Sequence, residues 1–480
     1  MQPIKDKIKR IIGFFPSKIE KYIYNYYWYI RSFPKLSVLY VKLITLPSII
    51  KEIEKEDSFI KKKNTAKNQV KKEKQNLVFK DIEKAQPQIN SLFHSSTYQY
   101  KIDKLKAIGD LKKRQDIFNQ IAPNFFQGQN FLNIGCNTGY FPLVAAQFFE
   151  KVQIIDEDEK FIKLCKTLKQ SNMEVFHDSF RDFMPLIEFD KIFIDNVHHH
   201  IFKQCRGWEW ICKLAAISNG EVLIEGPVDT DYKDIKTLFS KELQSKFTFE
   251  DFMQAMDPFF SLEKKIKSIN PDCWVMLFKR KLNRINNQVQ LDNLPITKIL
   301  KNGIHSLVYL TRFSGKKIVA KIIPPRFALN DYKIRIQIAS FSPLSNGITG
   351  FIYKNNKFVG WFEEYEDKRV NRSKENQVEL LKLICDHVIF LAKLGYFDID
   401  CSTRNFFKES NKFFDKGGVV HIKTLDWNID GTSNLSKFFQ NLNDGFNIID
   451  KEMLEIIYNA LNSKDLYLIE QAFISIKNRL

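Results

Sequence analysis

Short apolar runs alternate with segments of helical periodicity between residues 95 and 282. The runs NFLNIG, VQIID, MEVFH and FDKIFID each have the length of a buried strand, and each is followed by glycine, amide or acidic residues. Buried strands that alternate with helical segments are typical of βα units around a mostly parallel sheet. The pattern therefore predicts an α/β domain over residues 95–282.

The polarity pattern also divides the rest of the chain. NRINNQVQLDN at 283–293 is polar and predicts a structureless linker, so we expect a second domain over 294–480. Residues 57–94 are rich in Lys, which predicts a charged linker or an exposed helix. Residues 1–56 mix aromatic residues with Lys and Arg, which suits a helix in an anionic membrane interface. A helical extension packed on the following domain fits this segment equally well.

The composition says more about the compartment and the binding partners of the protein than about its reaction. The formal net charge of +18 favours a polyanionic partner such as nucleic acid, an anionic membrane surface or a phosphorylated substrate. A Lys-rich solvated surface explains the same charge. The seven cysteines include no CxxC pair and no Cys/His cluster at zinc spacing, so we expect a reduced, intracellular protein without a structural metal. No apolar stretch reaches the roughly 18 residues of a membrane span, and the N-terminal apolar run is too short for a signal peptide.

The first apolar run leads into a turn of small residues, GCNTG at 135–139. Gly135, Asn137 and Gly139 let the backbone turn sharply and approach a ligand at the start of the next helix. The second run ends in Asp156, where a carboxylate can accept hydrogen bonds from a ribose diol. These residues predict a nucleotide-type cofactor site, although dinucleotide-binding folds share this kind of turn.

The order of these motifs over about residues 100–280 resembles that of class I S-adenosylmethionine (SAM)-dependent methyltransferases. The resemblance implies a Rossmann-like domain whose glycine loop holds the methionine part of SAM and whose acidic residue after the second strand binds the ribose. Two positions depart from the family pattern, because Asn133 stands in place of an acidic residue and Asn137 in place of the central glycine. The cofactor-binding residues implied are Asn133, Gly135, Asn137, Gly139, Asp156, Asp178 near adenine, and Asp195 facing the methyl group.

Three consecutive histidines, residues 198–200, follow the fourth apolar run. A neutral imidazole at this position can orient an attacking oxygen or accept its proton. His199 and His200 align with a His-His pair that several methyltransferases carry, which makes both of them candidate catalytic residues. Positions at the edge of the core or at the surface are the alternatives, and metal binding is disfavoured because no further ligands accompany them. LIEGPVD places Glu225 and Asp229 near the same face.

A second group of motifs lies in the C-terminal part. Phosphoryl transfer from ATP needs a group that orients the acceptor, oxygens that hold metal, and a cation on the phosphates. Asp400 and Asn405 have the D-x-x-x-x-N spacing of a kinase catalytic loop, and Asp426 follows where kinases carry a metal-binding Asp. Lys321 lies in an apolar run, KKIVAKII, and Gly303 precedes it in a segment that resembles a Gly-rich loop. The resemblance implies that Asp400 is catalytic, that Asn405 and Asp426 hold Mg²⁺, and that Gly303 and Lys321 bind ATP.

The kinase pattern is incomplete, since one loop glycine remains, DWN replaces DFG, and no Glu lies between Lys321 and the hinge-like segment FVGWFEEYE. We therefore expect a small, atypical α+β kinase-like domain, with a degenerate binding module as the alternative. The domain order over about residues 95–430 resembles that of the bifunctional O-antigen chain-terminating methyltransferase/kinases of Gram-negative bacteria.

This second resemblance implies phosphorylation and then methylation of a polysaccharide terminus. It further implies a lipid-linked glycan as substrate, a glycosyltransferase as partner and a location at the cytoplasmic face of the membrane. The family attaches through its C-terminal part, so residues 1–56 are a departure, and we hypothesise that they dock this chain instead. The alternative is a methyltransferase of RNA or of a small metabolite. Nucleic acid is the less favoured substrate, because the Asn/Asp-Pro-Pro-Tyr motif of base N-methylation is missing.

Overall fold

The computed structural model describes most of the chain beyond residue 99. Several predictions lie outside the described residues: the extension 1–56, the linker 57–94, Asp229, Gly303, Asn405 and Asp426. The described residues are 100–101, 106–107, 109–228, 232–281, 287–302, 306–323, 330–366, 377–400, 418–424, 438, 440–442, 446, 448–463 and 465–480.

The described residues fall into two compact units. One contains Arg284–Leu329 and Ile348–Tyr365, and the other contains Lys74–Asn283, Asn330–Gly347 and Glu366–Leu480. The larger unit therefore combines the predicted methyltransferase residues with the C-terminal helices. The predicted domain boundaries at 282 and 294 stay a prediction.

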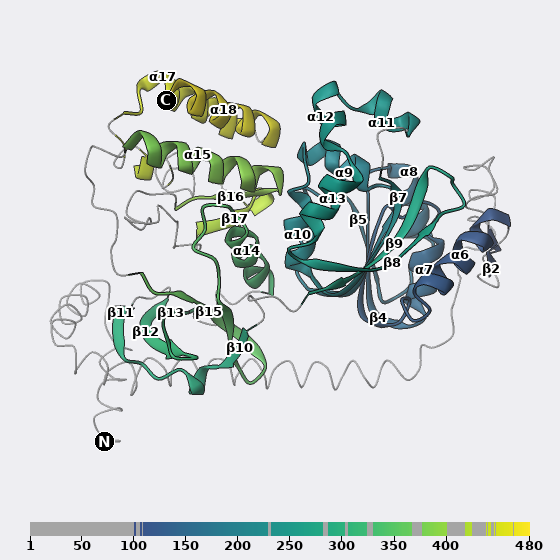
Figure 1. The fold of residues 1–480 in the computed structure, drawn as a ribbon, viewed down its shortest axis with the longest axis horizontal. Helices are drawn as coiled ribbons and strands as arrows, with labels where there is room; N and C mark the ends of the chain where they lie inside the picture. The colour runs from purple at the N-terminus through teal and green to yellow at the C-terminus, as the bar shows by residue number, and fades with distance from the viewer. Residues whose placement is uncertain are drawn as a thin grey trace. The chain divides into compact units, whose positions relative to one another are not determined.

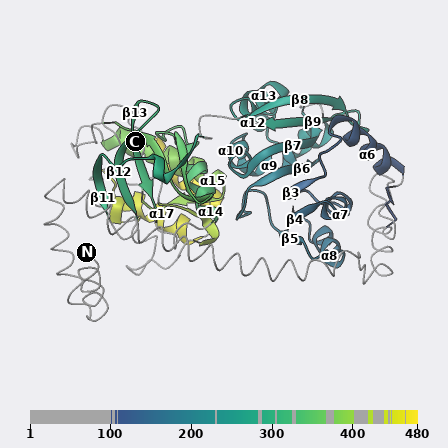
Figure 2. The ribbon, with the colours of Figure 1, turned by 90° about the horizontal axis from the view of Figure 1, so that it is seen from below.

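A seven-stranded sheet is the framework of the larger unit (Figure 1). Its strand order is β5-β4-β3-β6-β7-β9-β8, which can be followed by the labels in Figure 2. The first five strands in this order are parallel, whereas β9 runs antiparallel to β7 and β8 antiparallel to β9. The strand order reverses at β3, which lies between β4 and β6, and ligands of open α/β sheets bind at such a switch point. The strands are β3 (Gly128–Ile134), β4 (Phe149–Asp156), β5 (Met173–His177), β6 (Phe189–Asp195), β7 (Ser218–Pro227), β8 (Phe260–Lys267) and β9 (Cys273–Arg280).

Helices cover both faces of this sheet, as Figure 2 shows. One buried cluster joins the sheet to α6 (Gly109–Ile121), α7 (Tyr140–Ala146) and α8 (Glu159–Thr167). A second joins it to α9 (His198–Cys205), α10 (Trp210–Ile217) and α13 (Phe249–Met256). A doubly covered parallel sheet confirms the predicted Rossmann-like architecture. The remaining elements of this part are β1 (Tyr100–Lys101), β2 (Lys106–Ala107), α11 (Lys233–Leu238) and α12 (Lys241–Lys246).

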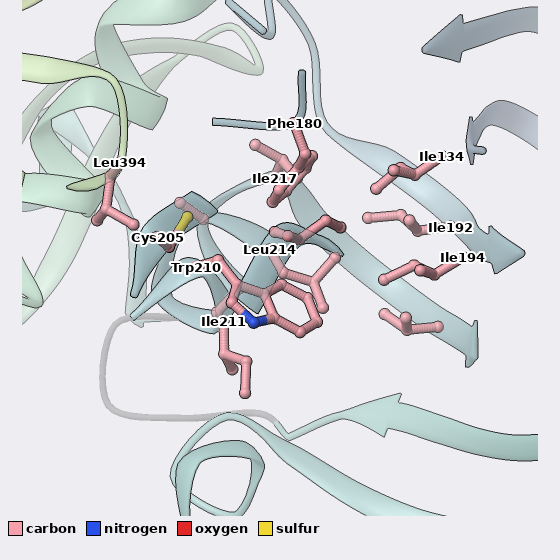
Figure 3. Close-up of a cluster of buried hydrophobic side chains, with 14 of the residues drawn as sticks. Ile134, Phe180, Ile192, Ile194, Cys205, Trp210, Ile211, Leu214, Ile217 and Leu394 are labelled. Atoms are coloured by element: carbon pink, nitrogen blue, oxygen red, sulfur yellow. The ribbon is translucent and has the colours of Figure 1, made fainter. Parts of the chain in front are cut away.

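The C-terminal helices belong to the same unit and extend its core. Leu394 enters the cluster that contains Trp210 and Leu214 of α10 (Figure 3), and Ile334 and Ile338 also belong to that cluster. A further apolar cluster holds the C-terminal helices together. The elements are α14 (Asn330–Ser340), α15 (Gln377–Lys393), β16 (Tyr396–Asp398), β17 (Val419–His421), η10 (Ile422–Thr424), α17 (Lys451–Asn462) and α18 (Leu466–Arg479).

The smaller unit contains a six-stranded sheet with the order β10-β14-β15-β13-β12-β11. Its neighbours are antiparallel except for β10 and β14, which are parallel. This second sheet confirms the expected mixed α/β chain with a sheet domain after the methyltransferase fold. The strands are β10 (Asn287–Gln290), β11 (Lys298–Asn302), β12 (Leu307–Phe313), β13 (Lys316–Ile322), β14 (Gly350–Lys354) and β15 (Lys357–Glu364), with the turn η5 (Leu291–Asn293).

One prediction about local structure is wrong. Residues 287–293 were expected in a structureless linker, but they form β10 and η5. Val289 and Leu291 explain the difference, because these two apolar side chains are buried among polar neighbours. Among the described residues, no helix combines the length and the apolar character that a membrane crossing requires.

Candidate cofactor and catalytic sites

The loop after β3 has the sharp geometry that its small residues predicted. Gly135 and Gly139 both have φ 80°, in the left-handed region that glycine adopts without strain. A Cβ on Gly135 would lie 2.6 Å from Cγ1 of Val197, so this position also needs the space that glycine leaves. The Gly139 N–H donates to the Cys136 carbonyl at 2.8 Å, and α7 begins at the next residue. The backbone of residues 135–139 can therefore approach a bound ligand closely.

Asp156 is the last residue of β4, as predicted, and its carboxylate is held in place by backbone donors. Oδ2 accepts from the Cys136 N–H at 2.7 Å, and Oδ1 accepts from the Asp158 N–H at 2.9 Å. The side chain of Asp158 in turn caps α8 by accepting from the Lys160 N–H at 2.8 Å. A carboxylate fixed in this way is preorganised to accept hydrogen bonds from a ligand diol.

A cavity of about 330 Å³ opens at the switch point and brings together four of the predicted residues, Gly135, Asp156, Asp178 and His200. Its volume lies at the lower end of the range of small-molecule sites, about 300–1,000 Å³. Ile134, Ile155, Phe180, Val197 and Ile201 add apolar walls. Apolar walls for a flat ring and fixed carboxylates for hydroxyl and amino donors fit the chemistry of SAM.

Asn133 lies behind the loop and is 1% exposed. Its Nδ2 donates to the carbonyls of Phe193, at 3.3 Å, and Gly135, at 3.4 Å. A carboxylate would repel both carbonyl oxygens, so the amide in place of the usual acidic residue is compatible with this backbone. Its Oδ1 is buried and has no hydrogen-bond partner among the described residues.

Asn137 has φ 46°, a conformation that Asn tolerates better than most residues, and its Nδ2 donates to Oδ2 of Asp195 at 3.1 Å. Asp195, at the end of β6, is 2% exposed and also pairs with Arg114 of α6. Arg114 pairs in addition with Glu225 of β7, and Oε1 of Glu225 accepts from the Ser268 hydroxyl. Burial raises the pKa of Asp195 to about 6, with a smaller contribution from Glu225 and opposition from Arg114. One buried cation therefore supports two carboxylates at the carboxyl edge of the sheet.

The three histidines begin α9 and have different surroundings. His198 is fully buried with Nε2 2.6 Å from the Pro227 carbonyl oxygen, and burial lowers its pKa to about 4. His199 is 2% exposed, and burial lowers its pKa to about 2, so its imidazole is neutral. His200 is exposed and lines the cavity. Of the two candidate catalytic histidines, His200 lines the cavity, whereas His199 is buried and does not line it.

The second candidate site is described only in part. Lys321 lies in β13, in the smaller unit, with Nζ 4.9 Å from the centroid of the Trp361 ring. Asp400 lies in the larger unit, two residues beyond β16, where Oδ1 accepts from Nδ2 of Asn441 at 3.2 Å. No group of three or more metal-ligating side chains occurs in the described part of the chain. The predicted metal ligands lie outside it.

The sequence patterns did not reveal four buried residues that support these sites. Two are the cations Arg114 of α6 and Lys213 of α10. The other two form a pair, His387 of α15 and Asp398 of β16, with Nε2 3.3 Å from Oδ2. Asp398 also accepts from the Asp400 N–H at 2.9 Å, so the pair supports the residue predicted to be catalytic. The helical pattern places Arg114 and Lys213 at core positions, which indicates that they are buried. It does not identify their partners, because these lie far away in the sequence.

Taken together, the sheet order, the glycine turn and the carboxylates at the switch point define a Rossmann-like fold with a ligand cavity at its carboxyl edge, and a second sheet domain follows along the chain. The structure is similar to that of the bifunctional kinase-methyltransferase WbdD, with 16% identity and a TM-score of 0.32 over 83% of this chain and 95% of that one. It is also similar to the N-methyltransferase NodS from Bradyrhizobium japonicum WM9, with 14% identity and a TM-score of 0.30 over 35% of this chain and 96% of that one.

A third similar structure is magnesium protoporphyrin IX methyltransferase from Synechocystis PCC 6803 with bound SAM. Here the identity is 14% and the TM-score 0.30, over 42% of this chain and 97% of that one. No protein-family model and no curated protein matches the sequence. Identities and scores of this size do not identify a substrate, so the chemistry below rests on the side chains of this chain.

Proposed function

We propose that this chain is a bifunctional enzyme that transfers a methyl group from SAM and a phosphoryl group from ATP to the terminus of a glycan. The cavity at the switch point carries the methyltransferase half of the proposal, because Gly135, Asp156 and Asp178 converge there with apolar walls. SAM supplies an electrophilic methyl group on a sulfonium, so the protein has to position the acceptor oxygen rather than activate the donor.

The residues of the cavity have distinct roles in this proposal. Asp156 accepts hydrogen bonds from the ribose hydroxyls, and the backbone at Gly135 approaches the methionine part. The Asp178 carboxylate accepts a hydrogen bond from the adenine. His200 lies at the cavity wall and orients the acceptor oxygen. Arg114 neutralises the carboxylates behind the loop, which would otherwise repel one another.

The kinase half of the proposal rests on motif order and on the framework around Asp400. Asp400 would orient a sugar hydroxyl, Lys321 would hold the phosphates with Gly303, and Asn405 and Asp426 would hold Mg²⁺. The buried pair of His387 and Asp398 supports the first of these roles, because Asp398 accepts from the Asp400 N–H. We further propose that residues 1–56 attach the enzyme to the inner face of the cytoplasmic membrane, beside a glycosyltransferase partner.

The test is incubation of the full chain with labelled ATP and labelled SAM against lipid-linked glycan, RNA and small sugars. We expect both labels in the glycan, and an Asp400→Ala variant that loses phosphate transfer by about 10²–10⁴-fold while SAM binding persists. Asp386→Ala is the matched control, because Asp386 lies at the surface of the same helical part and pairs with Lys477 at 2.6 Å. Methyl transfer to RNA or to a small molecule without any use of ATP would favour the alternative, a methyltransferase with a degenerate kinase-like module.

A further inference from the structure

Another cavity, of about 260 Å³, lies at the amino edge of the seven-stranded sheet, opposite to the cofactor cavity. Its walls come from α6, from the loop before β3, and from α7 with the residues that follow it. Gln127 lines this cavity just before β3 begins, and Ile134 lines the cofactor cavity where β3 ends. At about 3.3 Å per residue, the seven residues of β3 place the two cavities about 20 Å apart.

Four amide side chains form the polar part of this cavity, and none of the described residues that line it carries a charge. An amide offers one acceptor oxygen and two donor hydrogens, whereas a lysine only donates and a carboxylate only accepts. Neighbouring hydroxyl groups need this mixture, because each of them both donates and accepts. The four amides are Gln115, Asn119, Asn124 and Gln127.

Three phenylalanine rings form the apolar part. Phe126 stacks on the buried Phe141, with the ring centroids 5.7 Å apart and the planes inclined by 13°. Phe125 is 1% exposed and anchors the loop between Asn124 and Phe126 in the core, so the loop side chains start from a fixed backbone. Phe148 is 60% exposed, the largest fraction among the large apolar side chains that the structure describes. A ligand that covers this ring gains the free energy of its burial.

From this combination we propose that the cavity binds a neutral sugar unit of a glycan. The C–H groups on one face of a hexose pack against the negative face of an aromatic ring, while the hydroxyls exchange hydrogen bonds with the amides. The volume suits a sugar ring better than a drug-sized ligand. A phosphate or a nucleotide would meet no cation among the described lining residues, and a wholly apolar ligand would leave the amides without partners.

The role of this site rests on the proposed function, because that function supplies a polymeric acceptor. An internal unit of the polymer bound here would hold the chain on the enzyme while its terminus occupies the cofactor cavity. Tethering of this kind raises the effective concentration of the terminus. Only a glycan of several units spans the distance between the two cavities, so the site would favour long acceptors over short ones.

The experiment is a saturation-transfer NMR titration of the full chain, without SAM or ATP, with neutral tetrasaccharides of mannose, glucose, galactose and N-acetylglucosamine. We expect at least one of them to bind with a Kd of about 1 mM, which one sugar ring can supply. Phe148→Ser should weaken this binding about 5–10-fold, and Asn119→Ala about 3–10-fold. Both side chains are exposed, so the variants should fold.

Gln120→Ala is the matched control, because Gln120 is an exposed amide next to Asn119 on α6 but does not line the cavity. It should bind like the wild-type chain. Binding of none of the four tetrasaccharides, or binding that Phe148→Ser and Asn119→Ala leave unchanged, would overturn the inference. Absence of methyl and phosphoryl transfer to any glycan would instead overturn the proposed function and the tethering role, but not the sugar site, since the titration contains neither co-substrate.

Discussion

The two candidate sites differ in how the fold assembles them. At the carboxyl edge of the seven-stranded sheet, three of the residues predicted to bind SAM follow successive parallel strands and line one cavity in one compact unit: Gly135, Asp156 and Asp178. For the kinase-like site, Lys321 and Asp400 belong to different units. A parallel α/β sheet gathers its loops at one edge whatever their separation in sequence. The prediction of a kinase-like site therefore rests on motif order and on the contacts that hold Asp400.

The largest expected effect comes from removing the cation behind the cofactor loop. Arg114→Met would leave Asp195 and Glu225 buried beside each other without a counter-charge, and we expect a loss of about 3–5 kcal/mol of unfolding free energy. Hydrogen exchange should show lost protection in β6 and β7 and unchanged protection in β12 and β13, which would sharpen the contrast between the units.

Lys113→Met is the control for that change, because Lys113 is 71% exposed and pairs only at the surface with Asp110. Its effect should be within about 0.5 kcal/mol. Equal losses of protection in both sheets after Arg114→Met would contradict the idea that the network acts locally.

A matched pair of glycines compares the two regions directly. Gly135 and Gly315 have φ 80° and φ 78°, but a Cβ on Gly135 would meet Val197 while one on Gly315 meets nothing within 4 Å. Gly315→Ala should therefore cost only backbone strain, about 1 kcal/mol. Gly135→Ala should in addition weaken S-adenosylhomocysteine binding by about 10–100-fold, a loss of about 1.4–2.8 kcal/mol. Calorimetry and urea unfolding measure the two effects, and unchanged affinity in Gly135→Ala would remove the loop from the site.

A smaller effect should distinguish the two units, namely the pH dependence of their stability. Burial lowers the pKa of His198 and His199 from 6.5 in the folded protein, to about 4 and about 2, so the unfolded chain binds protons first as the pH falls below 6.5. Above pH 6.5 these histidines therefore do not lower the free energy of unfolding, and below that pH they lower it progressively. The described residues of the smaller unit contain no histidine.

We expect His199→Phe to recover about 1.4 kcal/mol of the stability that the wild-type chain loses between pH 7.5 and pH 5.5. Urea unfolding at the two pH values measures this difference. An acid sensitivity that His199→Phe does not alter would mean that His199 is protonated in the folded protein as readily as in the unfolded one.

Local patterns were sufficient for the elements that end in polar residues. β4 and β6 end at Asp156 and Asp195, as predicted, because each apolar run stops at the carboxylate that follows it. The same reasoning failed at 287–293, where Val289 and Leu291 are too few among polar residues to produce a recognisable strand pattern.

Contacts between residues far apart in the sequence could not be predicted from local patterns. Arg114 pairs with residues 81 and 111 positions away, and Lys213 reaches Leu394 across 181 positions. The helical pattern puts both residues at core positions, but among so many charged residues nothing in the sequence indicates which partners they would find. His387 and Asp398, which are only 11 positions apart, needed the helix and strand to be placed before their contact could be recognised.

The apolar cluster that Leu394 shares with Trp210 and Leu214 has a consequence for dividing this chain into fragments. A fragment that ends near residue 283 keeps the whole seven-stranded sheet, yet it loses Ile334, Ile338 and Leu394 from the face of α10. Lys213 would then keep only two of its three acceptors. Such a fragment would expose an apolar surface and aggregate, so the part of the chain with the seven-stranded sheet would be hard to express without the C-terminal helices.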